Sequence, residues 1–347
     1  MDITTVDKNF AVPTKIDIEG LKFYNIDNEP FSLHGIFKEN GKYRRLPEEV
    51  AKSVSTGVHY LHANTAGGRV KFTTDSRYVA IFARLGRFDR FPHFSLTGSL
   101  GFDMYVGTDY AATFMPPVNL KDEYEGYIDF GTSQKRDVTI NFPLYCEVNE
   151  LYIGIIEGSL LEKGAEYKNK KPVVFYGSSI TQGACASRAG MSYENILSRK
   201  FNLDYVNLGF SGSAKAEDAM IDYVKKLDMS VFVYDYDYNA PSTEHLKNTH
   251  KKMFDAVREI HPDIPIIIMN RPKFRLNAEE TVRYEIIRET FEAAVNSGDK
   301  NVYFVDNKKL CTLCRDEGTI ENCHPNDFGF YSMAMAVSEV FENLEIK

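Results

Sequence analysis

Two adjacent serines follow an apolar run in the middle of the chain. Residues 173–176 read VVFY, and the turn after them is Gly177-Ser178-Ser179-Ile-Thr-Gln-Gly183. A serine at the start of a helix is suited to nucleophilic attack, because backbone N–H groups there favour negative charge that develops on a substrate. The sequence of the turn does not show whether Ser178 or Ser179 is the nucleophile. The alternative is an ordinary turn at a strand end, in which neither serine is catalytic. The segment lacks the glycine and lysine pattern of a phosphate-binding loop and the G-x-S-x-G elbow of α/β-hydrolases.

A serine nucleophile needs a base that is neutral near pH 7, and histidine is the usual one. The histidines divide into those of the first half of the chain, those of a charged helical segment, and one near the C-terminus: His34, His59, His62 and His93; His245, His250 and His261; and His324. His324 alone follows the final apolar run, so it is the candidate that can meet the serine turn. It lies in the segment Glu321-Asn-Cys-His324-Pro.

Two further segments end apolar runs with groups that can donate hydrogen bonds. Residues 207–212 read NLGFSG, and the backbone amide of Gly212 is free to donate if the turn leaves it unpaired. Residues 231–239 end at Asn239, whose side chain is either an amide donor or a turn former. Either residue can belong to an oxyanion hole or to an ordinary turn.

The elements that must position these groups fall into two halves. Residues 1–163 contain short alternating apolar segments with many aromatic and β-branched residues, which predict an antiparallel β-sandwich domain of jelly-roll-like form. A charged linker at residues 164–171 follows. Residues 172–347 alternate five apolar strands with amphipathic helices, which predicts an α/β domain with a parallel sheet between two helical layers. Ligands bind such sheets at the carboxyl ends of the strands, where the candidate groups lie.

The four segments, taken in order, resemble the blocks of the SGNH or GDSL-like hydrolase superfamily of esterases. The family's G-D-S-[LI], N-x-x-x-S-G, asparagine and D-x-x-H-P blocks correspond to Gly177-Ser-Ser-Ile, residues 207–212, residues 231–239 and Glu321-x-x-His324-Pro. The first half is similar to the β-sandwich that precedes such domains in a bacterial subfamily, since Gly101-Phe-Asp-Met-Tyr resembles its G-x-D-L-Y signature. Together the resemblances cover nearly the whole chain.

This resemblance implies a role for each block. Ser179 would be the nucleophile and His324 its base, with Glu321 in the place of the aspartate that orients the histidine. The oxyanion hole would consist of the amides of Ser179 and Gly212 and the side chain of Asn239. Ser178 stands where the family usually has aspartate, and Glu321 carries one more methylene than the usual residue. A backbone carbonyl is the alternative partner for His324.

The resemblance favours an esterase that removes an O-acyl group, most plausibly acetyl, from a carbohydrate. Tyr236 and Tyr238 are candidates for packing on a sugar ring, with strand packing as the alternative. Arg188 is a candidate substrate contact, with a surface salt bridge as the alternative. The other functions considered are a thioesterase, a lysophospholipase or another small-ester hydrolase, and a non-catalytic glycan-binding protein.

Composition excludes several classes of partner. The net charge is -8 without a concentrated basic segment, so no nucleic-acid partner is expected. No apolar run is long enough to cross a membrane, and the first residues do not resemble a signal peptide, so a cytoplasmic location is expected, or a secreted or periplasmic one if a signal peptide has been removed. Five cysteines do not suggest a disulfide framework, and Cys311, Cys314 and Cys323 lack the fourth ligand of a zinc knuckle. No metal or cofactor is predicted. The oligomeric state is left open, and a homo-oligomer is one alternative.

Overall fold

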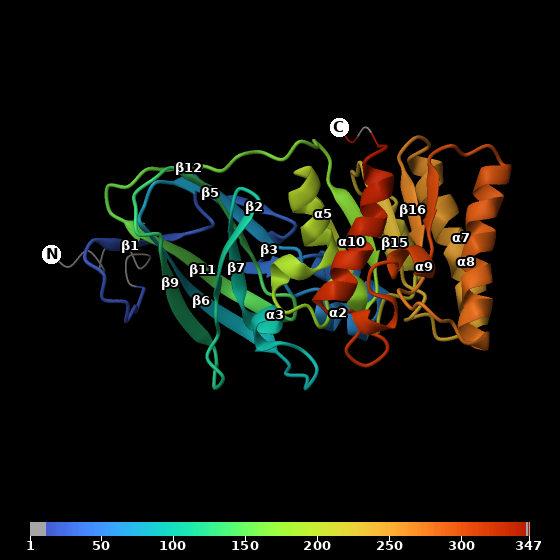
Figure 1. The fold of residues 1–347 in the computed structure, drawn as a ribbon, viewed down its shortest axis with the longest axis horizontal. Helices are drawn as coiled ribbons and strands as arrows, with labels where there is room; N and C mark the ends of the chain where they lie inside the picture. Colours follow the sequence, from blue (N-terminus) through green and yellow to red (C-terminus); the bar gives the residue numbers. More distant parts are fainter. Residues whose placement is uncertain (1–11, 345, 347) are drawn as a thin grey trace.

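The computed structural model describes residues 12–344 and 346. A mostly β region and an α/β region lie side by side, and strand β1 (Leu21–Asn25) and helix α8 (Ala278–Asn296) are at opposite ends of the long axis (Figure 1). This arrangement confirms the predicted fold class of a parallel-sheet α/β domain preceded by antiparallel sheets.

The first region contains two antiparallel sheets packed around a common apolar core. One sheet has the order β1 (Leu21–Asn25), β11 (Cys146–Ile156), β6 (Tyr78–Phe88) and β9 (Glu123–Asp129). The other has the order β12 (Leu161–Lys163), β5 (Arg69–Thr74), β10 (Arg136–Asn141), β7 (Phe102–Val106) and β8 (Asp109–Phe114), and β2 (Ser32–His34) also pairs with β5. A hairpin of β3 (Phe37–Glu39) and β4 (Lys42–Arg44) and the short helix α3 (Leu96–Leu100) complete this region.

The second region is built on a five-stranded parallel sheet. Its order is β14 (Tyr205–Gly209), β13 (Val173–Gly177), β15 (Val231–Asp235), β16 (Ile266–Met269) and β17 (Val302–Val305). The main helices are α5 (Tyr193–Phe201), α6 (Asp218–Val224), α7 (Thr243–Ile260), α8 (Ala278–Asn296) and α10 (Asp327–Phe341), and α4 (Ser179–Gln182) and α9 (Asn307–Leu310) are short. The five strands confirm the number that the apolar pattern predicts.

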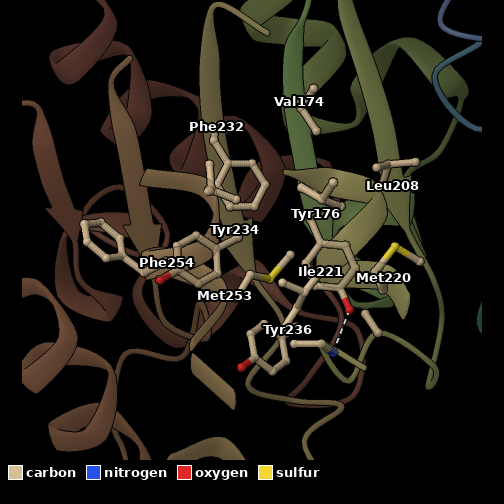
Figure 2. Packing of buried hydrophobic residues seen from close by; sticks show 14 of the residues in the cluster. Val174, Tyr176, Leu208, Met220, Ile221, Phe232, Tyr234, Tyr236, Met253 and Phe254 are labelled. Atoms are coloured by element: carbon tan, nitrogen blue, oxygen red, sulfur yellow. Dashed lines mark hydrogen bonds between the residues drawn. The ribbon is translucent and has the colours of Figure 1, made fainter. Parts of the chain in front are cut away.

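Alternate residues of the central strands enter two different cores, as the period of a strand requires. Val174 and Tyr176 of β13 pack with Phe232 and Tyr234 of β15 under α6, α7 and α8 (Figure 2). Residues 173 and 175 of β13 and 231 and 233 of β15 point the other way, toward α5 and α10. Both faces of the sheet are therefore covered, which explains why its strands are apolar throughout.

One segment of the predicted sandwich domain packs on the α/β region. Residues 46–61 fall within the predicted sandwich domain, yet they form α1 (Glu48–Val54) and α2 (Thr56–Leu61) and enter the core of the α/β region. Leu46 and Val58 are fully buried there together with Val174 and Phe210. The helical period of this segment is visible in the sequence, but the sequence does not show which sheet it covers.

The sandwich packs against β14, the strand at one edge of the parallel sheet. Arg45 is buried, and its Nη1 donates to the carbonyl oxygens of Asn207 at 3.0 Å and Gly209 at 2.7 Å in the edge strand β14. Arg69 donates to the carbonyl oxygen of Tyr205 at 3.0 Å. These bonds use acceptors near an edge that would otherwise be open to pairing with another chain. No helix within the described residues has both the length and the apolar character for a membrane span.

Candidate active site

The serine turn lies at the carboxyl end of the central strand β13. Ser178 is the N-cap of α4, and its Oγ accepts a hydrogen bond from the amide of Ile180 at 3.1 Å. Ser179 is the first helical residue, and its side chain points to the histidine loop rather than capping the helix. Gly183 ends the helix in the left-handed conformation, at φ 95°. The two serines thus have different environments, and only Ser179 meets a base.

A buried carboxyl group from the neighbouring strand β15 is hydrogen-bonded to this turn. Asp235 at the end of β15 accepts a hydrogen bond from Thr181 Oγ1 at 2.5 Å. Burial raises the pKa of Asp235 to about 8, so the group is largely protonated at neutral pH. A Cβ on Gly177 would lie 1.9 Å from Asp235 Oδ1, so this close approach requires glycine. The sequence interpretation overlooked Asp235, although a carboxylate at the end of a buried central strand is a recognisable signal.

The histidine loop closes over the serine from residues 319–326. His324 Nε2 lies 2.8 Å from Ser179 Oγ, and its Nδ1 is hydrogen-bonded to Glu321 Oε1. Partial burial alone would raise the pKa of Glu321, but its hydrogen bonds with His324 lower it below the ordinary value. The Ile320 amide donates to the carbonyl oxygen of His324 at 2.9 Å and closes the loop. The partner of His324 Nδ1 is therefore the Glu321 carboxylate and not a backbone carbonyl.

The candidate oxyanion donors Gly212 and Asn239 are tied to the serine turn through Phe210, whose amide donates to the carbonyl oxygen of Gly177 at 2.9 Å. Gly212 has a left-handed φ of 67°, and its amide meets no acceptor among the described residues. Asn239 Nδ2 donates to the carbonyl oxygen of Phe210 at 2.9 Å, which fixes the side-chain amide and leaves its second N–H available. An oxyanion hole needs donors that are held in place and not already paired, and the side chain of Asn239 and the backbone amide of Gly212 have these properties.

The three candidate substrate contacts lie in different environments. Tyr236 is 1% exposed and its hydroxyl is paired with Thr249 at 2.8 Å, so it belongs to the core in Figure 2 and offers no face to a sugar. Tyr238 is half-buried, with the guanidinium of Arg271 4.2 Å from its ring centre. For Tyr236 the packing alternative is therefore the correct one.

Arg188 forms an ion pair between the two regions. Its Nη1 lies 2.8 Å from Asp103 Oδ2 and is also hydrogen-bonded to Tyr105. The amide of Gly190 donates to the same carboxylate oxygen at 2.8 Å. Asp103 and Tyr105 belong to the sequence signature of the sandwich, so this signature serves to hold the segment that follows the serine turn. The salt-bridge alternative for Arg188 is the one found, and the pair is largely buried rather than on the surface.

The sandwich also contributes side chains that the sequence interpretation missed. The ring of His93 lies 5.6 Å from that of His324, and the ring of Phe94 lies 6.2 Å from it, centre to centre. The hydroxyl of Tyr145 donates to the carbonyl oxygen of Ser179 at 3.3 Å. These residues are distant in sequence from every catalytic block, so only the packing of the two regions brings them together.

An apolar cavity of about 380 Å³ opens beside the serine turn. It is lined by residues of both regions, among them Tyr60, Leu61, Phe91, Tyr145, Ser211 and Ser213. Ser211 directly precedes Gly212, and Tyr145 touches the backbone of Ser179, so the cavity adjoins the candidate oxyanion hole.

The cysteines do not form the zinc knuckle that was considered as an alternative. Within residues 12–344, Cys311, Cys314 and Cys323 do not bring three ligand atoms together. Two other groups do place their ligand atoms within 4.8 Å of one another: His93 with Cys185 and His324, and Glu321 with Cys323 and His324. Both ring nitrogens of His324 already have partners in Ser179 and Glu321.

Comparison with protein families matches both regions. The family of GDSL-like lipases and acylhydrolases matches residues 170–342, and the family described as the N-terminus of SGNH-hydrolase-type esterases, GxDLY, matches residues 21–161. A search of curated protein sequences found no match.

Solved structures with the same fold include three with informative descriptions. A GDSL-like lipase from Bacteroides ovatus ATCC 8483 is 28% identical with a TM-score of 0.83, covering 94% of this chain and 99% of its own. The salicylyl-acyltransferase SsfX3 from a tetracycline biosynthetic pathway is 19% identical with a TM-score of 0.78, covering 95% and 100%. The acetyl xylan esterase Est2A from the rumen bacterium Butyrivibrio proteoclasticus is 14% identical with a TM-score of 0.61, covering 93% and 98%. The chain belongs to the GDSL-like lipase/acylhydrolase family of SGNH-type hydrolases, with the GxDLY N-terminal domain, and is a carboxylic ester hydrolase.

Proposed function

We propose that this protein is a serine esterase that removes O-acetyl groups from a carbohydrate. The observation that carries the proposal is the 2.8 Å contact between Ser179 Oγ and His324 Nε2, with Glu321 on the opposite nitrogen of the ring. This order of nucleophile, base and carboxylate is the arrangement that activates a hydroxyl group for acyl transfer.

The reaction would follow from the positions of these groups. Ser179 Oγ attacks the ester carbonyl carbon while His324 Nε2 accepts the hydroxyl proton. The carbonyl oxygen becomes an oxyanion that accepts hydrogen bonds from the amides of Ser179 and Gly212 and from Asn239 Nδ2. The C–O bond to the alcohol then breaks, and His324 gives its proton to the leaving alkoxide. A water molecule attacks the acyl-serine by the same route in reverse and releases the acid.

Glu321 would act through the histidine. Its contact with Nδ1 keeps the proton on that nitrogen, so that Nε2 is free to accept the proton of Ser179. The lowered pKa of Glu321 keeps the carboxylate ionised while the imidazole cycles, and its charge stabilises the imidazolium that forms. The glutamate reaches Nδ1 from three residues away along the same loop, so the extra methylene does not prevent the contact.

The carbohydrate substrate is supported by the fold and by the access to the serine. One protein of the same fold is named as an acetyl xylan esterase. The histidine side of the site is open, since the side chain of Glu321 is 40% exposed and that of His324 is 19% exposed. An open rim of this kind admits a large polar alcohol, whereas only the acetyl group must enter the space beside Ser179.

Acetate release from acetylated xylan and mannan oligosaccharides tests this proposal. We expect wild-type protein to release acetate and Ser179→Ala to release none. A serine-directed organophosphonate should label wild type and Ser178→Ala in equal amounts, but not Ser179→Ala. Labelling without acetate release would retain the serine esterase and reject the carbohydrate substrate, and an absence of labelling would reject the esterase mechanism as well.

The apolar cavity favours a second candidate, an esterase for a bulkier apolar acyl group. Its 380 Å³ exceed what an acetyl group needs, and the aromatic residues that line it suit an aryl or medium-chain acyl group. The relative rates on acetyl and octanoyl nitrophenyl esters separate the two candidates. If the cavity holds the acyl chain, Phe91→Ala should lower kcat/KM for octanoyl relative to acetyl by roughly tenfold. Tyr127→Ala is the matched control, because Tyr127 is an exposed aromatic residue on strand β9 of the sandwich. It should change neither rate.

A further inference from the structure

A second cavity, of about 200 Å³, lies between the sandwich and helix α5. The strands β5, β7 and β10 form one wall, and the side chains of α5 form the other. Three cationic side chains line it, Arg69, Lys71 and Arg199, together with the amides Asn141 and Asn195. Among its described lining residues, Asp137 alone has a carboxylate. None of these residues lines the apolar cavity beside the serine turn.

Lys71 is buried at this cavity without a counter-ion. It is 4% exposed, and its Nζ has no hydrogen bond and no ion pair within residues 12–344. Nζ lies over the ring of Tyr167, whose centre is 4.3 Å away. Burial lowers the pKa of Lys71, and the neighbouring Arg69 lowers it further, whereas Asp137 acts in the opposite sense. Nζ is accessible from the cavity, so a molecule bound there can supply the acceptors that the protein does not give it.

Arg199 is the second cation without an acceptor. Its guanidinium lies 4.1 Å from the ring centre of Tyr105 and donates no hydrogen bond to any described residue, and its Nη1 is buried. Burial lowers the pKa of Arg199 as well. Asp204 pairs with Arg69 and Asp103 pairs with Arg188, so both carboxylates already have a cation, while Asp137 Oδ1 accepts the amide of Ala165 at 2.7 Å.

We propose that this interdomain cavity binds a small oxyanion, such as phosphate, sulfate or a carboxylate, through Lys71 and Arg199. An oxyanion supplies the acceptors that both cations lack, and charge-assisted hydrogen bonds to it are the strong kind. Lys71 belongs to the sandwich and Arg199 to the α/β domain, so a bound anion joins the two domains at a position separate from the catalytic serine. Binding to the folded state alone stabilises that state.

Thermal unfolding and calorimetry with defined anions test the proposal. The full chain is titrated with sodium phosphate, sulfate or acetate, and sodium chloride at matched ionic strength is the reference. We expect at least one oxyanion to raise the Tm of wild type by roughly 1–3 °C beyond chloride at concentrations well above Kd. A stronger effect of phosphate or sulfate indicates a tetrahedral ligand, and a stronger effect of acetate indicates a carboxylate.

Variants assign the effect to the cavity. Lys71→Met and Arg199→Gln should each weaken binding at least about tenfold, whereas Lys121→Met, which removes the same charge from an exposed position, should bind as wild type does. Without the anion, Lys71→Met should melt at or above the wild-type temperature, because it removes a buried charge that has no partner. Ser179→Ala should bind the anion normally.

Two results would overturn this inference: no shift beyond chloride in wild type, or equal shifts in wild type, Lys71→Met and Arg199→Gln. If Lys71→Met does not fold, as its esterase activity will show, Arg199→Gln decides by the same criterion. Neither result bears on the esterase, whose activity is measured separately.

Discussion

The serine side of the active site is set in the core of the α/β domain, whereas the histidine side is an exposed loop. Ser179 follows the central strand of the sheet, and the buried pair of Thr181 and Asp235 supports its turn. His324 and Glu321 are three residues apart on the loop of residues 319–326, and the Glu321 side chain is 40% exposed. Buried tertiary contacts therefore support Ser179, whereas the hydrogen bonds of His324 other than that to Ser179 come from its own loop.

This difference predicts how the two sides respond to substitution. Changes on the serine side alter the free energy of unfolding, because the groups that support the turn are buried, whereas the rate depends there on the nucleophile itself. Changes on the histidine loop affect the rate and its pH dependence with little effect on the free energy of unfolding, because exposed groups contribute little to it. Substitutions in each side test the contrast.

The largest effect is expected for Ser179→Ala. Loss of the nucleophile should lower kcat by roughly 10⁴-fold or more, whereas Ser178→Ala should keep kcat within a few-fold of wild type. Ser178→Ala should instead lower the free energy of unfolding by about 1 kcal/mol, because it removes the cap of α4. Steady-state kinetics and urea unfolding of both variants measure these effects. Similar loss of activity in both would show that the two serines do not have separate roles.

Asn239→Ala should have the next largest effect. Removing one oxyanion donor typically costs about 10²–10³ in kcat, and KM should change little because the donor acts mainly on the transition state. Asn239 also donates to the carbonyl oxygen of Phe210, so the free energy of unfolding should fall by about 1 kcal/mol. A change in KM with kcat intact would instead place Asn239 in ground-state binding.

Glu321→Gln tests the histidine loop. Its side chain is partly exposed and water can replace part of its effect, so we expect kcat to fall by roughly 10–100-fold, less than loss of a fully buried partner costs. Because the pKa of Glu321 is lowered, its carboxylate stays ionised until the pH falls below the ordinary pKa of a glutamate, and only there should the rate advantage of wild type over the variant shrink.

Glu317→Gln is the matched control for this loop, since Glu317 is exposed in the adjoining turn and makes no side-chain contact with His324. It should leave both rate and profile unchanged. The unfolding midpoint of Glu321→Gln should equal that of wild type, and a clear loss of stability would contradict the description of this side as locally held.

The sequence pattern singled out residues that the structure brings to one edge of the sheet, but it did not predict what surrounds them. Ser179, Gly212, Asn239 and His324 all follow strands, and parallel strands end at one edge of a sheet, so strand assignment alone brings them together. The role of each serine came from the resemblance, because the turn does not distinguish them.

What the pattern did not predict depends on contacts between the domains. His93 and Tyr145 reach the site only because the sandwich packs on strand β14, and no local periodicity encodes that packing. Tyr236 was a plausible sugar contact because it follows a strand, yet its side chain is buried in the core of the α/β region. Residues 46–61 show a helical period, but the domain that they cover is decided by long-range burial.

The smallest effect on activity, and the sharpest test of the serine side, is expected for Asp235→Asn. The folded protein holds the proton of this carboxyl up to about pH 8, whereas the unfolded chain loses it near pH 4, so the unfolded state binds fewer protons between these values. The free energy of unfolding of wild type should therefore fall as the pH rises from about 4 to about 8, and Asn, which cannot ionise, removes this dependence. Urea unfolding at several pH values should show that the variant gains stability relative to wild type across this window while kcat stays within a few-fold. A constant difference between the two proteins would mean that Asp235 is ionised in the folded state, and that the serine turn rests on a buried charge rather than on a neutral hydrogen bond.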